Sequence, residues 1–165
     1  MLDKRNKIFF LALAVSLALL AAMGIIGHKQ DQGYLADYRE FLKAETLVAD
    51  KKHREAEPVY ADLTVKYPTS YVVYWRHGVC LAAGGDYEKA AAQYEKAGRL
   101  NPLLRKDQSY LVQLGEIMFN LGKDEDAEAY FLAVQKVNSK NSLAKQADKY
   151  LKSIKTRRDK EGVSP

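Results

Sequence analysis

A residue pattern that recurs along the chain constrains its fold more than any other feature. Small, aromatic and proline residues repeat 34 positions apart, first as Ala56, Tyr60 and Pro68 and then as Ala90, Tyr94 and Pro102. A third copy follows after 37 positions, with three extra residues in the connection LLRKDQS, so that Gly78, Gly85, Ala90 and Tyr94 return as Gly115, Gly122, Ala127 and Phe131. A fixed period of about 20–50 residues is the signature of stacked repeats. The chain is therefore predicted to fold as repeated units that each pack on the next.

The recurring residues have defined tasks if each unit is a pair of helices. A glycine inside a helix costs about 1 kcal/mol relative to alanine, so Gly78 and Gly115 predict a close approach between the paired helices. Tyr94 and Phe131 are expected to fill the space beside them. Turns between the helices are predicted at Gly85 and Gly122 and, in the first unit, at residues 51–53, where Lys-Lys-His replaces the glycine.

This pattern resembles the tetratricopeptide repeat (TPR) family. The resemblance implies an all-α fold, a TPR-like α-solenoid of three helix-turn-helix repeats at residues 35–69, 70–104 and 108–141. After these repeats, Leu143, Ala147, Leu151 and Ile154 form an apolar stripe at helical spacing. A repeat array otherwise leaves its last apolar face in water. Residues 142–158 are therefore predicted to form a capping helix, followed by a disordered tail at 159–165.

An uncharged, mostly apolar run of 20 residues precedes the repeats, at positions 8–27. A helix of this length spans about 30 Å, the thickness of a bilayer core. Three basic residues among positions 1–7 place the N-terminus in the cytoplasm by the positive-inside rule. The sequence predicts a transmembrane helix (a signal anchor) at 8–27, a linker at 28–34, and repeats on the extracytoplasmic side of a bacterial cytoplasmic membrane. The alternative is a cleaved signal peptide.

Composition argues against chemistry at the repeats. One cysteine and three histidines, which lie 24 or more positions apart, provide no metal cluster, and no phosphate-binding or hydrolase motif is present. We therefore expect a protein that is not an enzyme and needs no cofactor or metal. Cys80 is expected to be a small buried residue, with an intermolecular bridge as the alternative.

The positive charge lies at the two ends of the chain. Residues 1–27 carry +2 and residues 145–165 carry +4, so the total of +5 leaves residues 28–144 at −1. Nucleic-acid binding needs a basic surface. No nucleic-acid partner is therefore predicted. The basic tail at 155–165 is interpreted as a solvated, frayed end, with an electrostatic contact to anionic lipid or polymer as the alternative.

The resemblance also implies a binding site, because first helices line a concave groove in this family. Carried onto this chain, the partner-binding groove comprises Tyr38, Phe41, Glu45, Val72, Trp75, Val79, Ser109, Val112, Glu116 and Phe119. Such an aromatic, apolar and mildly acidic surface suits an extended or helical peptide. The alternative is that these residues pack against the linker or the capping helix. Some members bind acidic chaperone tails through paired Lys, Asn and Arg on this face; that clamp is absent here, which disfavours acidic tails.

Together these features predict a membrane-anchored scaffold or adaptor for protein–protein interaction. It would bind a peptide or partner protein in envelope assembly or export, and no small-molecule substrate is inferred. Two alternatives remain open, a cytosol-facing organelle import receptor and a noncatalytic substrate-capture subunit of an envelope enzyme.

Overall fold

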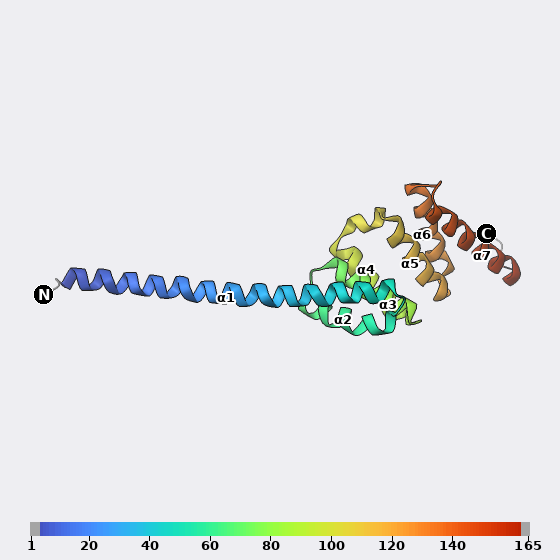
Figure 1. The fold of residues 1–165 in the computed structure, drawn as a ribbon. Helices are drawn as coiled ribbons and strands as arrows, with labels where there is room; N and C mark the ends of the chain where they lie inside the picture. The colour runs from blue at the N-terminus through green and yellow to red at the C-terminus, as the bar shows by residue number, and fades with distance from the viewer. Residues whose placement is uncertain (1–3, 163–165) are drawn as a thin grey trace. The chain divides into compact units, whose positions relative to one another are not determined.

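The fold is helical throughout the described residues. The computed structural model describes residues 4–162, with side chains at 13, 15–24, 28, 32–160 and 162. Within that range the helices, shown in Figure 1, are α1 (Lys4–Ala49), α2 (His53–Lys66), α3 (Tyr71–Ala83), α4 (Tyr87–Leu100), the 3-10 helix η1 (Pro102–Lys106), α5 (Gln108–Asn120), α6 (Asp124–Val137) and α7 (Ser142–Glu161). No strand occurs between residues 4 and 162. The predicted all-α fold is confirmed. The chain divides into two compact units, Met1–Leu42 and Lys43–Pro165.

The first unit consists of the N-terminal part of α1. The helix continues without interruption through residues 28–34, which were expected to form a linker. The rings of Tyr38 and Phe41 stack on this helix, with centroids 6.5 Å apart and planes 12° apart.

The predicted location of the protein needs correction. Among the described residues, no helix is both long and apolar enough to cross a membrane. This finding contradicts the prediction of a single-pass protein of the cytoplasmic membrane. Within the predicted span 8–27, the described side chains are those of residues 13 and 15–24. The other side chains of that span lie outside the described ones.

The second unit is built from helical hairpins. Helices α3 and α4 form one pair, α5 and α6 form the next, and α7 packs on both α5 and α6. The side chains of Asp86, Asp107 and Asn141 cap the N-termini of α4, α5 and α7 by accepting a backbone N–H three residues on. Such caps stabilise a helix by about 1 kcal/mol each.

The turns and close helix contacts follow the repeat pattern. Gly85 and Gly122 adopt φ values of 88° and 71°, which favour glycine. A Cβ atom on Gly78 would lie 2.5 Å from Cδ2 of Tyr94, and one on Gly115 would lie 2.8 Å from Cε1 of Phe131. The prediction that these glycines permit close helix packing is confirmed.

The capping helix is longer than predicted. Helix α7 runs to Glu161, so residues 159–161 of the expected tail are helical, whereas 163–165 lie outside the described residues. Ala147 and Ile154 on α7 join the core formed by α3 to α6 and are almost completely buried.

Candidate functional site

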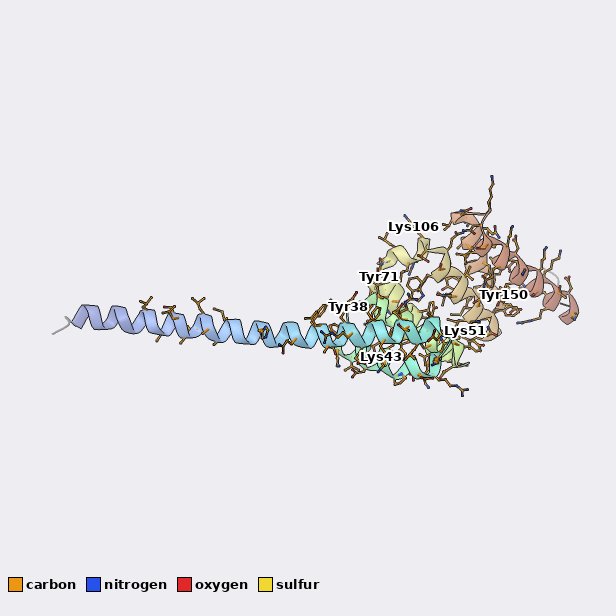
Figure 2. The ribbon with its side chains drawn as sticks, viewed as in Figure 1. Tyr38, Lys43, Lys51, Tyr71, Lys106 and Tyr150 are labelled. Carbon is orange, nitrogen blue, oxygen red and sulfur yellow. The ribbon has the colours of Figure 1, made fainter. Side chains whose placement is uncertain are left out.

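The first helices of the second and third repeats, α3 and α5, and the capping helix α7 each carry a partly buried aromatic side chain. These are Trp75 on α3, Phe119 on α5 and Tyr150 on α7, and we call them the aromatic row. Figure 2 labels Tyr150 on α7. Each ring is held by contacts with neighbouring helices, so the row presents rigid apolar surface.

Trp75 is fixed by a polar contact and an aromatic contact. Its Nε1 donates a hydrogen bond to Oε1 of Gln113 at 2.8 Å, and the Tyr94 hydroxyl donates to the same oxygen at 2.8 Å. The Trp75 ring also meets the Tyr110 ring edge-on, with centroids 5.7 Å apart. Burial raises the pKa of the Tyr94 hydroxyl far above its ordinary value, so it remains a hydrogen-bond donor at neutral pH.

Phe119 and Tyr150 contact each other directly. Their rings meet edge-on at 5.2 Å, and the Arg157 guanidinium lies 4.2 Å from the centre of the Phe119 ring. Tyr150 also stacks on Phe131, with centroids 4.9 Å apart. Aromatic pairs of this kind contribute about 0.5–1.5 kcal/mol beyond the area that they bury.

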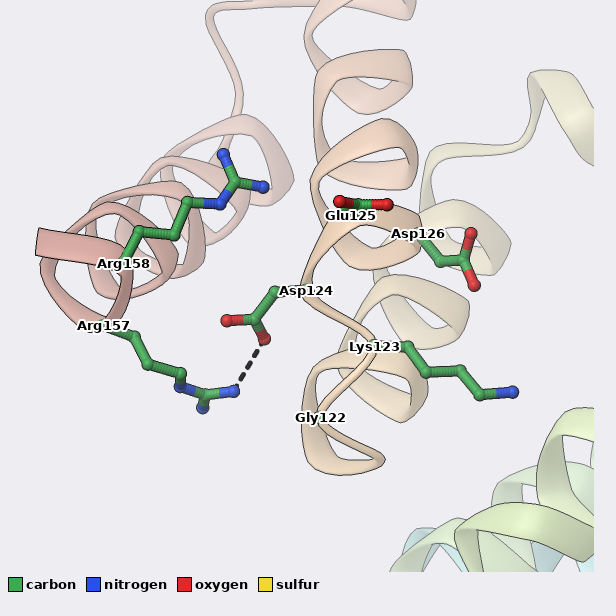
Figure 3. A pocket seen from close by; sticks show the side chains of 7 residues that line it. All are labelled: Gly122, Lys123, Asp124, Glu125, Asp126, Arg157 and Arg158. Carbon is green, nitrogen blue, oxygen red and sulfur yellow. Dashed lines mark hydrogen bonds and ion pairs between the residues drawn. The ribbon is translucent and has the colours of Figure 1, made fainter. Parts of the chain in front are cut away.

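Two ion pairs hold α7 against the start of α6. Arg157 donates to Asp124 at 2.6 Å, as Figure 3 shows, and Arg158 donates to Glu128 at 2.5 Å. Asp124 lies in the first turn of α6, where the helix dipole also favours negative charge. Arg157 thereby positions α7 and at the same time covers one face of Phe119.

Helix α7 adds two surface hollows beside the aromatic row. One, of about 600 Å³, is lined by Ser142, Lys145, Gln146, Lys149, Tyr150 and Ser153. The other, of about 430 Å³, is lined by Phe119, Lys152, Ser153, Thr156, Arg157 and Lys160. The surface beside Phe119 and Tyr150 is therefore basic, because lysines from α7 line both hollows.

The sequence-based site omitted Tyr150, although the sequence carries a signal for it. Asn141 caps α7 as Asp107 caps α5, and Tyr150 follows its cap by the same nine positions as Glu116. Aligning the helix caps would have placed Tyr150 among the first-helix surface residues. The repeat pattern ends before α7, so it assigns no binding surface to this helix.

The structure places the predicted groove residues in different environments. Val112 is only 2% exposed and belongs to the core, which corrects the expectation that it lines an open groove. The reason is that α5 is packed by α4, α6 and α7. Val72, Val79 and Ser109 are partly exposed.

The predicted acidic residues of the groove are already engaged. Glu116 accepts a hydrogen bond from Gln146 of α7 at 2.5 Å, in line with the alternative that α7 covers part of this surface. Glu45 accepts the Tyr60 hydroxyl at 2.5 Å and pairs with Arg76 at 2.8 Å. Tyr38 and Phe41 lie in the first unit, described above.

Cys80 lies in a buried polar neighbourhood on α3. It is 2% exposed. Burial, with smaller contributions from Glu57 and Glu45 and against an opposing one from Arg76, raises the pKa of its thiol to about 11. Nearby, His77 and Glu57 form a hydrogen bond of 3.0 Å. Among the described residues, no group of three His, Cys, Asp or Glu side chains could hold a metal ion.

Cys80 is expected to resist thiol reagents in the folded protein. The thiolate is the reactive form, and the raised pKa keeps the thiol neutral up to about pH 11. Alkylation by iodoacetamide at pH 8 should therefore be about a hundredfold slower than in urea, where the pKa returns to about 8.5. Mass spectrometry of timed samples measures both rates, and equal rates would contradict the buried placement.

Comparison with known proteins defines the class of fold. Residues 73–103 match a family model described as tetratricopeptide repeat, and residues 108–141 match a second model of the same description. The chain therefore carries tetratricopeptide repeats and has a TPR-like helical repeat fold. The comparison with curated protein sequences found no match.

Similar solved structures include several complexes with peptides or protein segments. The Yersinia enterocolitica type III secretion chaperone SycD with a peptide of the translocator YopD is 18% identical, with a TM-score of 0.62 over 73% of this chain and 92% of that one. The first TPR of Spaghetti (RPAP3) with an HSP90 peptide is 19% identical, with a TM-score of 0.63 over 73% and 91%. PcrH with the chaperone-binding region of PopD is 17% identical, with a TM-score of 0.62 over 73% and 91%. At these identities the likeness is one of fold.

Proposed function

We propose that the second unit binds a segment of a partner protein along α3, α5 and α7, with the aromatic row as its anchors. The observation that carries this proposal is that Trp75, Phe119 and Tyr150 lie on α3, α5 and α7, and that each is held by a neighbouring helix. Rigid aromatic side chains bury a large apolar area on binding and lose little conformational freedom. Such a row favours a peptide over a catalytic role.

The similar structures support a peptide as the occupant. SycD, RPAP3 and PcrH are each described with a peptide or a chaperone-binding region of another protein. In this chain the groove would comprise the partly exposed Val72, Val79 and Ser109 of the predicted set, the aromatic row, and the basic hollows of α7. The proposed role is that of a non-enzymatic scaffold or adaptor. The expected envelope role depended on a membrane anchor and is not carried forward.

Replacing Trp75 by alanine is expected to weaken partner binding about tenfold, because truncating an aromatic anchor commonly costs more than 1 kcal/mol. The partner segment is first identified by photocrosslinking from position 79, which neighbours Trp75 on α3, and is then synthesised as a peptide. Its affinity for the full-length protein is measured by calorimetry. Phe119→Ala provides a second variant, on a different helix.

The matched control is Val65→Ala, a truncation at a side chain that is 79% exposed on α2. It should leave both the affinity and the helix content unchanged. Equal affinities for Trp75→Ala, Phe119→Ala and the unaltered protein, with helix content intact, would refute the proposed binding surface.

A further inference from the structure

A third hollow, of about 610 Å³, lies between α4, η1, α5 and α6. Its wall includes Leu111 and Leu114, each 3% exposed, and the partly buried Ala133. Arg105 and Tyr130 also line it. Pockets that hold small ligands typically measure about 300–1,000 Å³ and combine an apolar lining with a few polar groups. This hollow has that volume and that composition.

The 3-10 helix η1, which lies where the repeat period is interrupted, forms one wall of the hollow. The three extra residues between the second and third repeats are accommodated in η1, which Asn101 caps by accepting the Leu103 N–H at 3.2 Å. Leu104 anchors η1 in the core at 5% exposure, and Arg105 follows it. Lys106, labelled in Figure 2, ends this helix.

Tyr110 forms a fixed part of the wall. Its hydroxyl donates to the Tyr94 carbonyl oxygen at 2.7 Å. A Cβ atom on Gly98 would lie 2.6 Å from that hydroxyl, so the glycine leaves the room that the Tyr110 side chain needs. Burial raises the pKa of Tyr110 to about 12, and its hydroxyl therefore stays protonated and bonded.

Two hydrogen-bond donors in the hollow have no partner of their own. Glu95 pairs with Arg99 at 3.5 Å. Between residues 4 and 162, by contrast, Arg105 forms no ion pair and the Tyr130 hydroxyl forms no hydrogen bond. Burial raises the pKa of Tyr130, Asp126 and Glu95 add to the effect, and the Arg105 charge opposes it. Arg105 and Tyr130 line the same hollow from η1 and α6, so one acceptor group bound there would meet donors from two different elements.

We propose that this hollow binds a small apolar carboxylate, with the apolar group against Leu111, Leu114 and Ala133 and the carboxylate accepting hydrogen bonds from Arg105 and Tyr130. A guanidinium and a hydroxyl are both donors, and a carboxylate is an acceptor only. The site is separate from the proposed peptide surface and does not depend on it. The carboxyl-terminal residue of a peptide offers the same chemistry, and the experiment separates the two sources.

The test titrates 4-phenylbutanoate into the isotope-labelled full-length protein and follows the backbone amide signals by NMR. Signals of Leu111, Leu114 and Ala133 are expected to shift with saturation, whereas the uncharged 4-phenylbutanamide should leave them in place. Arg105→Gln and Tyr130→Phe should each lower the affinity for 4-phenylbutanoate about tenfold, because a hydrogen bond to a charged group contributes about that much to binding. The peptide acetyl-Gly-Gly-Phe is expected to bind more weakly than the free acid.

Arg54→Gln is the matched control. Arg54 is exposed on α2, so this substitution removes the same charge at a site outside the hollow. It should leave the affinity unchanged. Any of four results would overturn the proposal. The first two are unshifted backbone signals of Leu111, Leu114 and Ala133, and binding of 4-phenylbutanamide as tight as that of the acid. The other two are a loss of affinity in Arg54→Gln as large as that in Arg105→Gln, and tighter binding of the peptide than of the free acid.

Discussion

Replacing Phe131 by alanine is expected to lower the free energy of unfolding by about 3–5 kcal/mol, the usual cost of removing a buried aromatic ring. Phe131 is fully buried, fills the space beside Gly115, and stacks on Tyr150 of α7. Its removal leaves a cavity between α5 and α6 and also frees the ring that completes the aromatic row. The measurement is urea unfolding of the full-length protein, followed by far-ultraviolet circular dichroism.

Leu132→Ala is the control, because Leu132 is the next residue on α6 and is 47% exposed. This truncation should change the free energy of unfolding by less than about 1 kcal/mol. Similar losses for the two variants would show that Phe131 is not the residue that holds the third repeat together.

The repeat pattern predicted the contacts within a hairpin because those contacts are local in sequence. Tyr94 follows Gly78, and Phe131 follows Gly115, by the same 16 positions, and both pairs meet in the structure as expected. In the first repeat, the turn between the helices forms without a glycine. Lys51 adopts a φ of 61° in its turn, a backbone conformation that the sequence did not indicate.

Contacts between repeats were harder to predict because they depend on how helices stack. Val112 has the spacing of a surface residue, but the helices around α5 bury it. Tyr150 was assigned to a cap, but it stacks on Phe131 and meets Phe119. The hollow beside Arg105 depends on the path of η1, which an insertion in a repeat does not specify.

Replacing Gly78 by valine is expected to lower the free energy of unfolding by about 3 kcal/mol, near the upper end for overpacking. The new Cβ would lie 2.5 Å from Cδ2 and 2.7 Å from Cε2 of Tyr94, and 3.3 Å from the carbonyl oxygen of Ala90. Tyr94 cannot move aside easily, because it is 1% exposed and its hydroxyl is bonded to Gln113. Helices α3 and α4 must therefore separate, and urea unfolding measures the cost.

Two controls separate this clash from a general intolerance of valine in the second repeat. Gly84 follows the last residue of α3 in a right-handed conformation, and a Cβ atom added there would lie 3.4 Å from its nearest neighbour, the Leu81 carbonyl oxygen. Gly84→Val should therefore lower the free energy of unfolding by less than about 1 kcal/mol. Shortening the opposing ring by Tyr94→Leu should relieve the clash, so the double variant should be more stable than the sum of the single losses predicts, by about 1 kcal/mol or more. Strict additivity would mean that the valine acts through the helix backbone, and the close approach of α3 to α4 would then not be the reason for a glycine at position 78.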